Sequence, residues 1–243
     1  MKRAAKIKFF AGMISAMIAS ILVLSCASGL PAFGADKGAK RVGPKTVRVP
    51  YTQIDSYYGY VLKDSPADGT ENGKKKFFIY VWIPLAAPEI GVRMISPIPD
   101  GMKPAGKDFV SSTFAKGEEA DPGRTKYFDT WIAFERASGI VTASQIPNAK
   151  TATWSRIETN DDSSEMPKNP GGSYYNSLMR IESEVSNPLK ALVAGLYRVA
   201  FTSFRSSDVE GSFLAQIGAP IAIPGVVIGQ TIESVIEQIN AKK

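Results

Sequence analysis

Short strand-like segments separated by turn-forming residues recur along the chain. Val47, Val49 and Tyr51 alternate with Arg48, Pro50 and Thr52. The segment 77–83 is apolar on both faces up to Pro84, as in a strand covered on both sides. Many short strands with few helices predict an all-β class and a β-sandwich, of which the jelly roll is one form. Further strands are expected at 91–96, 128–135, 176–182, 196–204 and 212–217.

Two segments have helical patterns, one at 107–115 and one near the C-terminus, where Ile232, Val235 and Ile239 form one face behind a capping Thr231. The chain has one cysteine, so a packed core must hold it together, and 12 Phe, 9 Tyr and 3 Trp supply material for that core. The segment 220–229 is either buried beneath the last helix or a homodimer contact. Five strand aromatics either pack in the core, as their spacing favours, or line a ligand-binding face: Tyr57, Tyr58, Tyr60, Tyr80 and Trp82.

The first 25 residues have the layout of a secretory signal. Cations up to Lys8 precede an apolar stretch at 9–24, which is shorter than the about 20 residues of a membrane-spanning helix. Cys26 follows in the string VLSC, which is similar to a bacterial lipobox, whose cysteine is acylated after cleavage. The competing interpretation is ordinary cleavage near Ala35. Cleavage before Cys26 divides the chain into a signal peptide (1–25), a lipidated cysteine with a flexible tether (26–41) and a single β-sandwich domain (42–243).

Charge and missing residue types exclude several classes of function. The signal holds four of the 29 Lys and Arg and no acid, so its removal lowers the formal net charge from +6 to +2, which argues against a nucleic-acid partner. The chain has no histidine, which excludes Ser-His-Asp and Cys-His catalysis and His-ligated zinc or iron. No phosphate-binding loop or dinucleotide fingerprint is present. We therefore expect no enzyme, with a carboxylate-based hydrolase as an alternative.

The richest acidic stretch, 158–165, includes Asp161 and Asp162 and is followed by Pro, Asn and Gly residues that predict a loop. Adjacent carboxylates with Asn and Ser oxygens nearby are hard ligands of the kind that Ca²⁺ takes. A solvated acidic loop is the ordinary alternative. A second acidic stretch, 68–73, lacks the spacing of an EF-hand loop and is better explained as a turn before a lysine-rich hairpin edge at 74–76.

Eight short blocks together resemble one known family. In chain order they are 57–61 (YYGYV), 80–84 (YVWIP), 91–97 (GVRMISP), 128–131 (FDTW), 175–178 (YNSL), 195–198 (GLYR), 211–213 (GSF) and 223–226 (IPGV). In this order they resemble the major outer-membrane lipoprotein family of leptospires, from about Ser56 to Val226.

The resemblance implies a jelly-roll β-sandwich held at the outer membrane by an acylated cysteine, here Cys26, facing either the cell surface or the periplasm. It also implies calcium binding and attachment to host matrix proteins such as collagen, fibronectin and laminin. The family's calcium ligands are an Asp-Thr pair in the FDTW block, two consecutive aspartates of an acidic loop and the tyrosine of the YNSL block. The matching positions are Asp129, Thr130, Asp161, Asp162 and Tyr175.

Ligand chemistry assigns a role to each matching residue. Neighbouring side chains on a strand point to opposite faces, so Asp129 should offer its carboxylate, and Thr130 its backbone carbonyl or, at a strand end, its hydroxyl. Tyr175 should offer its carbonyl, because a neutral phenol is a poor ligand for a hard cation. The sequence departs from the family in a shorter acidic run and in a shorter, less lysine-rich C-terminus ending at Lys243. Those departures bear on calcium affinity and on matrix binding, respectively.

Three functions follow from these observations. The first is a calcium-binding surface lipoprotein that acts as an adhesin or binding module for matrix proteins or surface polysaccharide. The second is a structural envelope lipoprotein in which calcium serves stability alone. The third is the carboxylate-based hydrolase, which needs two acidic groups facing one cleft. Calcium-dependent binding of a macromolecule separates the first from the second.

Overall fold

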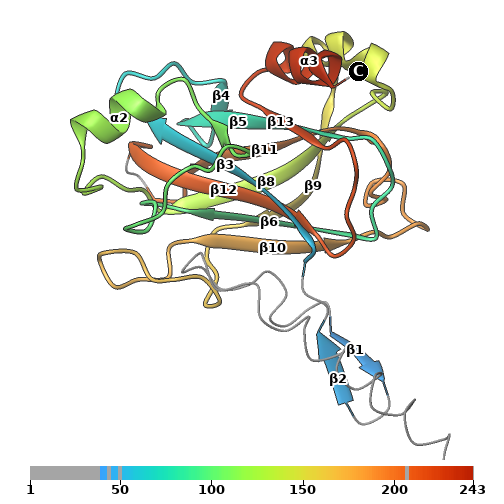
Figure 1. Ribbon diagram of the computed structural model, residues 1–243, viewed down its shortest axis with the longest axis horizontal. Helices are drawn as coiled ribbons and strands as arrows, with labels where there is room; N and C mark the ends of the chain where they lie inside the picture. Colours follow the sequence, from blue (N-terminus) through green and yellow to red (C-terminus); the bar gives the residue numbers. More distant parts are fainter. Residues whose placement is uncertain (1–38, 43–44, 49–50, 206–207, 243) are drawn as a thin grey trace, which may run out of the picture. The chain divides into compact units, whose positions relative to one another are not determined.

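Two sheets packed face to face form the body of the protein (Figure 1). The computed structural model describes residues 39–42, 45–48, 51–205 and 208–242. Sheet I has the strand order β10-β6-β12-β3-β7, in which only β7 pairs in parallel. Sheet II has the order β13-β5-β11-β8-β9, with β4 added beside β5. This is the double-sheet arrangement of a jelly roll, and it confirms the expected all-β sandwich with a few short helices.

The bounds of these elements follow the apolar segments of the sequence. Sheet I contains β10 (Ser177–Glu182), β6 (Glu89–Ile95), β12 (Gly211–Ala219), β3 (Gln53–Val61) and β7 (Phe109–Val110). Sheet II contains β13 (Val227–Gly229), β5 (Lys74–Ile83), β11 (Gly195–Ser203), β8 (Thr130–Ala137), β9 (Trp154–Asn160) and β4 (Gly69–Glu71). A separate hairpin joins β1 (Ala39–Val42) to β2 (Lys45–Arg48). The helices are α2 (Phe114–Ala120), the 3₁₀ helix η2 (Ala143–Lys150) and α3 (Ile232–Ala241).

The core lies between the two sheets, because alternate side chains of each strand point inward. Ile79 of β5 and Phe213 of β12 are both buried in this core. The Phe213 ring lies 4.8 Å from the Phe201 ring and 6.1 Å from the Tyr57 ring, measured between centroids. Aromatic packing between strands far apart in sequence therefore joins the sheets, as the high aromatic content predicts.

Most sequence-based strands are confirmed, with ends shifted by one or two residues. The segment 91–96 corresponds to β6 and 196–204 to β11. The alternation at 47–51 falls on the end of β2 and the residues before β3, with 49 and 50 outside the described residues. The acidic stretch that begins at 158 is also partly strand, since β9 continues to Asn160.

The helix expected at 107–115 is wrong. Residues 109 and 110 pair in parallel with β3 as β7, and the helix begins only at Phe114. The backbone N–H of Ser111 donates to the carbonyl of Tyr58 at 2.8 Å, which extends the contact with β3. Pairing with a strand about 50 positions earlier overrides the local helical pattern.

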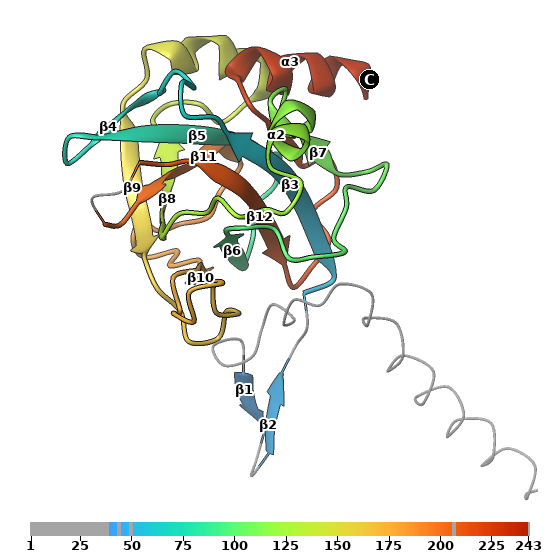
Figure 2. The same cartoon turned by 90° about the vertical axis from the view of Figure 1, so that its left-hand side faces the viewer.

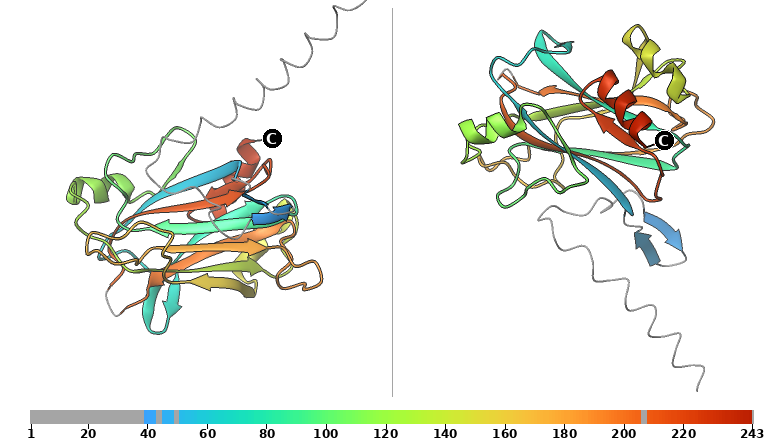
Figure 3. Two further views of the ribbon diagram at one scale, coloured as in Figure 1. Left: turned by 90° about the horizontal axis from the view of Figure 1, so that it is seen from below. Right: turned by 45° about the horizontal axis from the view of Figure 1, so that its top comes forward.

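The C-terminal helix is confirmed. The hydroxyl of Thr231 accepts the backbone N–H of Ser234 at 3.0 Å, which caps α3 as expected. α3 lies beside η2 on the outer face of sheet II (Figure 3), where Val235 packs in one buried cluster with Trp82 and Val227. Trp82 is therefore covered on the outer face, whereas Tyr80 on the same face is half-buried. The segment 220–229 is only partly buried: Val227 and Ile228 are buried, whereas Ile221 is exposed.

A tight hairpin turn explains the acidic stretch before the lysines. Asn72 and Gly73 both have positive φ, 49° and 78°, which a two-residue turn between right-twisted strands requires. The turn joins β4 to β5, and the three lysines open β5 as predicted. Lys76 reaches back to Glu71 at 3.1 Å across the hairpin.

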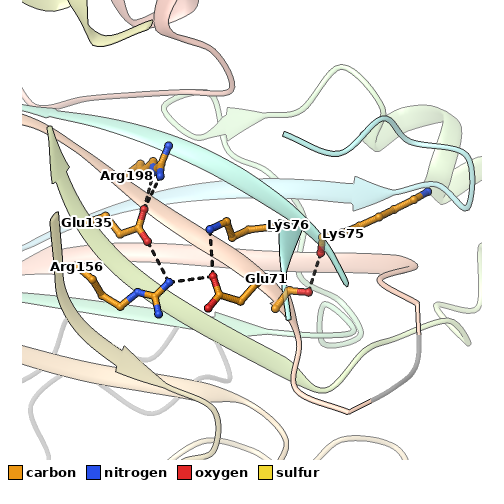
Figure 4. A network of polar contacts seen from close by, with 7 residues as sticks. Glu71, Lys75, Lys76, Glu135, Arg156 and Arg198 are labelled. Carbon is orange, nitrogen blue, oxygen red and sulfur yellow. Dashed lines mark hydrogen bonds and ion pairs between the residues drawn. The ribbon is translucent and has the colours of Figure 1, made fainter. Parts of the chain in front are cut away.

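Alternating charges cover the outer face of sheet II (Figure 4). The register places Glu135 of β8 opposite Arg198 of β11 on one side and Arg156 of β9 on the other. Its carboxylate contacts Arg198 at 2.6 Å and Arg156 at 3.4 Å, and Arg156 also contacts Glu71 at 2.9 Å. The Arg198 guanidinium lies 3.7 Å from the Phe78 ring centroid and 4.1 Å from that of Trp154. Each cation is thus held by an acid or by an aromatic face, so this sheet surface is internally satisfied.

Asp121 organises the long connection between β6 and β8. Its carboxylate accepts the backbone N–H groups of Thr125 and Lys126, both at 3.0 Å, and the Thr125 hydroxyl at 2.9 Å. Burial raises the pKa of Asp121, but these hydrogen bonds outweigh burial and hold its pKa below the usual value. A pKa that is lower in the folded state stabilises the fold above the unfolded pKa, and this stabilisation is lost as pH falls through the folded pKa.

We predict that Asp121→Asn lowers the free energy of unfolding by about 1–3 kcal/mol at pH 7, because Asn keeps one accepting oxygen and its amide nitrogen cannot accept the N–H group that binds the other oxygen. The difference from the parent should shrink below about pH 4, where the parent carboxylate becomes protonated. Urea unfolding at both pH values measures this, with the exposed Asp64→Asn as control. Equal stability of Asp121→Asn and the parent at pH 7 would contradict the assigned role.

Candidate metal site

Strand pairing gathers the predicted ligands at one end of the sandwich. β8 begins at Thr130, opposite Ser203 near the end of β11, and Ile132 of β8 lies opposite Asn160 at the end of β9. In Figure 2 the connection 161–176 (gold) continues from the arrowhead of β9. Asp129 precedes β8, Asp161 and Asp162 follow β9, and Tyr175 lies two residues before β10. All five predicted site residues therefore lie at this end.

Thr130 ties β8 to the end of the acidic connection. Its backbone N–H donates to the carbonyl of Tyr175 at 3.0 Å, and its hydroxyl lies 3.3 Å from the same oxygen. The Ser177 hydroxyl lies 2.6 Å from the carbonyl oxygen of Thr130 and 3.1 Å from that of Asp161. A carbonyl oxygen has two lone pairs, so hydrogen bonding leaves Thr130 and Asp161 able to accept a further partner.

Asp129 is the most unusual side chain of the site. It is 7 % exposed, and neither of its carboxylate oxygens has a hydrogen-bond partner. The Nε of Arg205 lies 3.6 Å from Oδ2, which is an ion pair without a hydrogen bond. Burial, followed by repulsion from Asp162, raises the pKa of Asp129 to about 6, although Arg205 acts in the opposite direction. A buried carboxylate without hydrogen bonds is costly and calls for a missing cation or donor.

The paired aspartates add negative charge next to Asp129. Oδ1 of Asp161 accepts the backbone N–H of Asp162 at 3.0 Å, and the amide of Asn160 donates to the carbonyl of Asp162 at 3.1 Å. Burial and the neighbouring Asp161 raise the pKa of Asp162. Asp162 is exposed and Asp161 half-buried, so both lie at the surface of a site whose inner wall is Asp129.

The residues fit a hard cation in donor chemistry. Every predicted ligand offers oxygen, and Ca²⁺ takes about 6–8 oxygen ligands that include carboxylates, carbonyls and water. Among the residues that the structure describes, however, no three acidic, cysteine or histidine side chains surround one point closely enough to hold a metal. Mutual repulsion of three carboxylates favours such a spread arrangement, and Arg205 is the nearest compensating charge.

Sequence reasoning missed several residues that shape this end. Arg205 approaches Asp129 and stacks on the Tyr175 ring, with its guanidinium carbon 4.9 Å from the ring centroid. Asn176 accepts the backbone N–H of Ser96 at 2.9 Å and donates to the carbonyl of Pro167 at 2.8 Å. Asn176 and Ser177 belong to the YNSL block. Two adjacent polar residues at the start of an expected strand were the sequence feature that could have marked them as part of the site. Arg205 gave no local signal, because only the pairing of β11 with β8 brings it here.

The β-sandwich is an architecture shared by many cell-surface domains. Residues 45–228 match the family Lipl32, described as a surface lipoprotein of the Spirochaetales order, and the chain belongs to this family. Comparison with curated proteins gives no match. No helix within the described residues is both long and apolar enough to cross a membrane.

Family membership confirms the resemblance drawn from the eight blocks. The protein is a surface lipoprotein, associated with a membrane at the surface, and its family is not a known enzyme family. The expected signal peptide, Cys26 and most of the expected tether lie outside the described residues.

Proposed function

We propose that this surface lipoprotein binds Ca²⁺ at Asp129, Asp161 and Asp162 and uses the ordered end of the sandwich to attach to a macromolecule. The observation that carries the proposal is the buried Asp129 carboxylate, which has no hydrogen bond and is repelled by the charges of two further aspartates. A divalent cation would neutralise the repulsion among these three groups and supply the missing partner.

Each residue has a separate role in this proposal. The three aspartates supply charge, and the Thr130 carbonyl is a neutral oxygen donor at the base of the acidic connection. The Tyr175 carbonyl, which accepts the N–H and the hydroxyl of Thr130, would join it when that hydroxyl turns to Ser177. Ser177 and Asn176 position that connection through their hydrogen bonds. Ion binding would add to the stability of the folded state by mass action and would restrain the connection 161–176.

A cavity next to the acidic connection suggests how calcium controls attachment. The cavity, of about 560 Å³, lies between the segment 95–100, residues 123–125 and the later part of the acidic connection. Pro167, Lys168 and Asn169 line it, and they follow Asp161 and Asp162 by only a few residues. An ion that restrains Asp161 and Asp162 would therefore also restrain the cavity wall formed by 167–169. Matrix proteins and surface polysaccharide are the partner classes that we propose.

The first prediction concerns the ion itself. Titration calorimetry of the protein from Ala27 onward should give heat with Ca²⁺, and saturating Ca²⁺ should raise the melting temperature. Asp129→Asn and the double variant Asp161→Ala/Asp162→Ala should each weaken affinity by about tenfold or more, because ligand charge sets affinity. Glu184→Gln, at the opposite end, is the control and should bind like the parent. No heat and no thermal shift in the parent would reject calcium, and an unchanged double variant would move the site elsewhere.

The second prediction separates a binding module from a purely structural role. The parent should bind immobilised collagen, fibronectin, laminin or surface polysaccharide in Ca²⁺, and binding should fall severalfold in a chelator or in Asp129→Asn. Binding is measured by surface plasmon resonance at fixed ionic strength. Calcium binding without any partner, or with a partner that ignores calcium, would support the structural envelope role instead.

The third prediction concerns the anchor. Cys26→Ser should abolish incorporation of labelled palmitate and release the protein from the membrane fraction, because Cys26 is the only cysteine in the chain. The parent expressed in the same cells is the control. Palmitate retained by Cys26→Ser would refute the anchor and favour cleavage near Ala35.

A further inference from the structure

The end of the sandwich opposite the aspartates has a different surface. Strand register places four connections there: 84–88, 138–142, 183–194 and 220–226. In Figure 1 they lie on the right, whereas α2 and the connection 161–176 lie on the left. We call these four connections the apolar end.

Exposed apolar side chains concentrate at the apolar end. Of nine large hydrophobic residues that are exposed in the described part of the chain, six are on these four connections. Their exposed fractions run from 39 % for Val193 to 90 % for Val185. The six are Leu85, Val141, Val185, Leu189, Val193 and Ile221. Single exposed apolar residues need no explanation, but a concentration on neighbouring loops does.

Charge is almost absent from the same connections. Among their residues only Glu184 and Lys190 are charged, and these two pair with each other at 3.1 Å. The connections at the other end carry several acids and bases, including Asp161, Asp162 and Arg205. A surface with little charge and many aliphatic groups suits an apolar environment better than water.

The connections are held in place by backbone hydrogen bonds. The N–H of Ala87 donates to the carbonyl of Leu192, and that of Ser183 to the carbonyl of Pro88, both at 2.8 Å. Arg136 donates to the carbonyl of Ala191 at 2.8 Å. The aliphatic side chains therefore project from fixed backbone rather than from loose loops.

The chain also enters the sandwich at the apolar end. β3 begins at Gln53, opposite Ala219, and the backbone N–H of Thr52 donates to the carbonyl of Ala219 at 3.1 Å. The Thr52 hydroxyl donates to the carbonyl of Pro220 at 3.1 Å, next to the exposed Ile221. The segment that leads from Cys26 to the fold thus joins it beside these side chains.

From these observations we infer that the apolar end rests on the lipid surface, with its aliphatic side chains inserted at the level of the headgroups. The inference depends on the anchor at Cys26 proposed above, which would keep lipid at high effective concentration near the point of chain entry. Amphipathic helices at membranes bury an apolar face about 5–10 Å into the headgroup boundary, and aliphatic side chains on a fixed surface can insert by the same hydrophobic effect. The aspartates would then face away from the membrane.

A second copy of the chain is the competing occupant of the apolar end. Protein interfaces are enriched in aromatic residues and arginine. The exposed large residues at the apolar end are all aliphatic, whereas the exposed aromatics Tyr174 and Phe204 lie at the other end. This composition and the position of chain entry favour lipid.

Depth measurements on the full-length acylated protein test the inference. Because Cys26 is acylated in that form, a single introduced cysteine can carry a spin label. Labels at Leu85→Cys, Leu189→Cys and Ile221→Cys are compared with two controls that are also about half exposed: Phe204→Cys at the opposite end, and Val110→Cys on the edge strand β7 beside Tyr58 in the interior of β3. In vesicles of phosphatidylethanolamine and phosphatidylglycerol, the first three should lie about 5 Å or more below the phosphates, and the two controls should remain in water.

The remaining outcomes each contradict the inference in a different way. Water exposure of all five labels on vesicle-bound protein would reject lipid contact while leaving the anchor intact. Protection of the first three labels in detergent that increases with protein concentration would assign the apolar end to self-association. Failure of the unlabelled protein to float with vesicles would reject the anchor and the inference together. Calcium has no part in these readouts, so the result does not depend on the metal proposal.

Discussion

The pairing of β8 with both β9 and β11 is the constraint on which the candidate site depends. It brings the start of one strand beside the ends of two others, so that residues more than 30 positions apart share one rim. Ser177 then closes the rim from the neighbouring sheet through its contacts with Thr130 and Asp161. A shift of one residue in either pairing would turn these side chains to the other face of the sheet. The core between the sheets, built from alternate apolar residues, fixes that register.

Two buried acids of sheet II and its edge, Glu135 and Asp129, have different surroundings. Glu135 is enclosed by Arg198 and Arg156, and each of these two arginines also lies over an aromatic ring. Asp129 is also buried but lacks any hydrogen bond, and Asp161 and Asp162 both repel its charge. Because of this contrast, we assign Glu135 a structural role and propose that Asp129 binds an ion. The same fold that surrounds Glu135 with cations leaves both carboxylate oxygens of Asp129 without a hydrogen bond.

Local sequence predicted much of the fold, because two-residue alternation and turn chemistry act over a few residues. The hairpin at Asn72 and Gly73, the strands around Phe77 and Phe213, and the cap at Thr231 were all visible in this way. The false helix at 107–115 failed because β7 exists only through its contact with β3. Within the site, the five oxygen donors came from the family resemblance, and their proximity in the fold could not be derived from spacing. Arg205 was missed because nothing in its neighbourhood marks it.

Strand β12 occupies the middle of sheet I, between β6 and β3, although it comes from the last fifth of the chain. Until Gly211–Ala219 is available, the earlier strands of that sheet have no shared neighbour and their inward faces have no complete core. Folding must therefore wait for nearly the whole polypeptide, since long-range pairing cannot begin with its central member missing. For a surface protein this order keeps the nascent chain open while it is translocated. The position of β12 near the end of the chain thus determines when sheet I can be completed and the protein can fold.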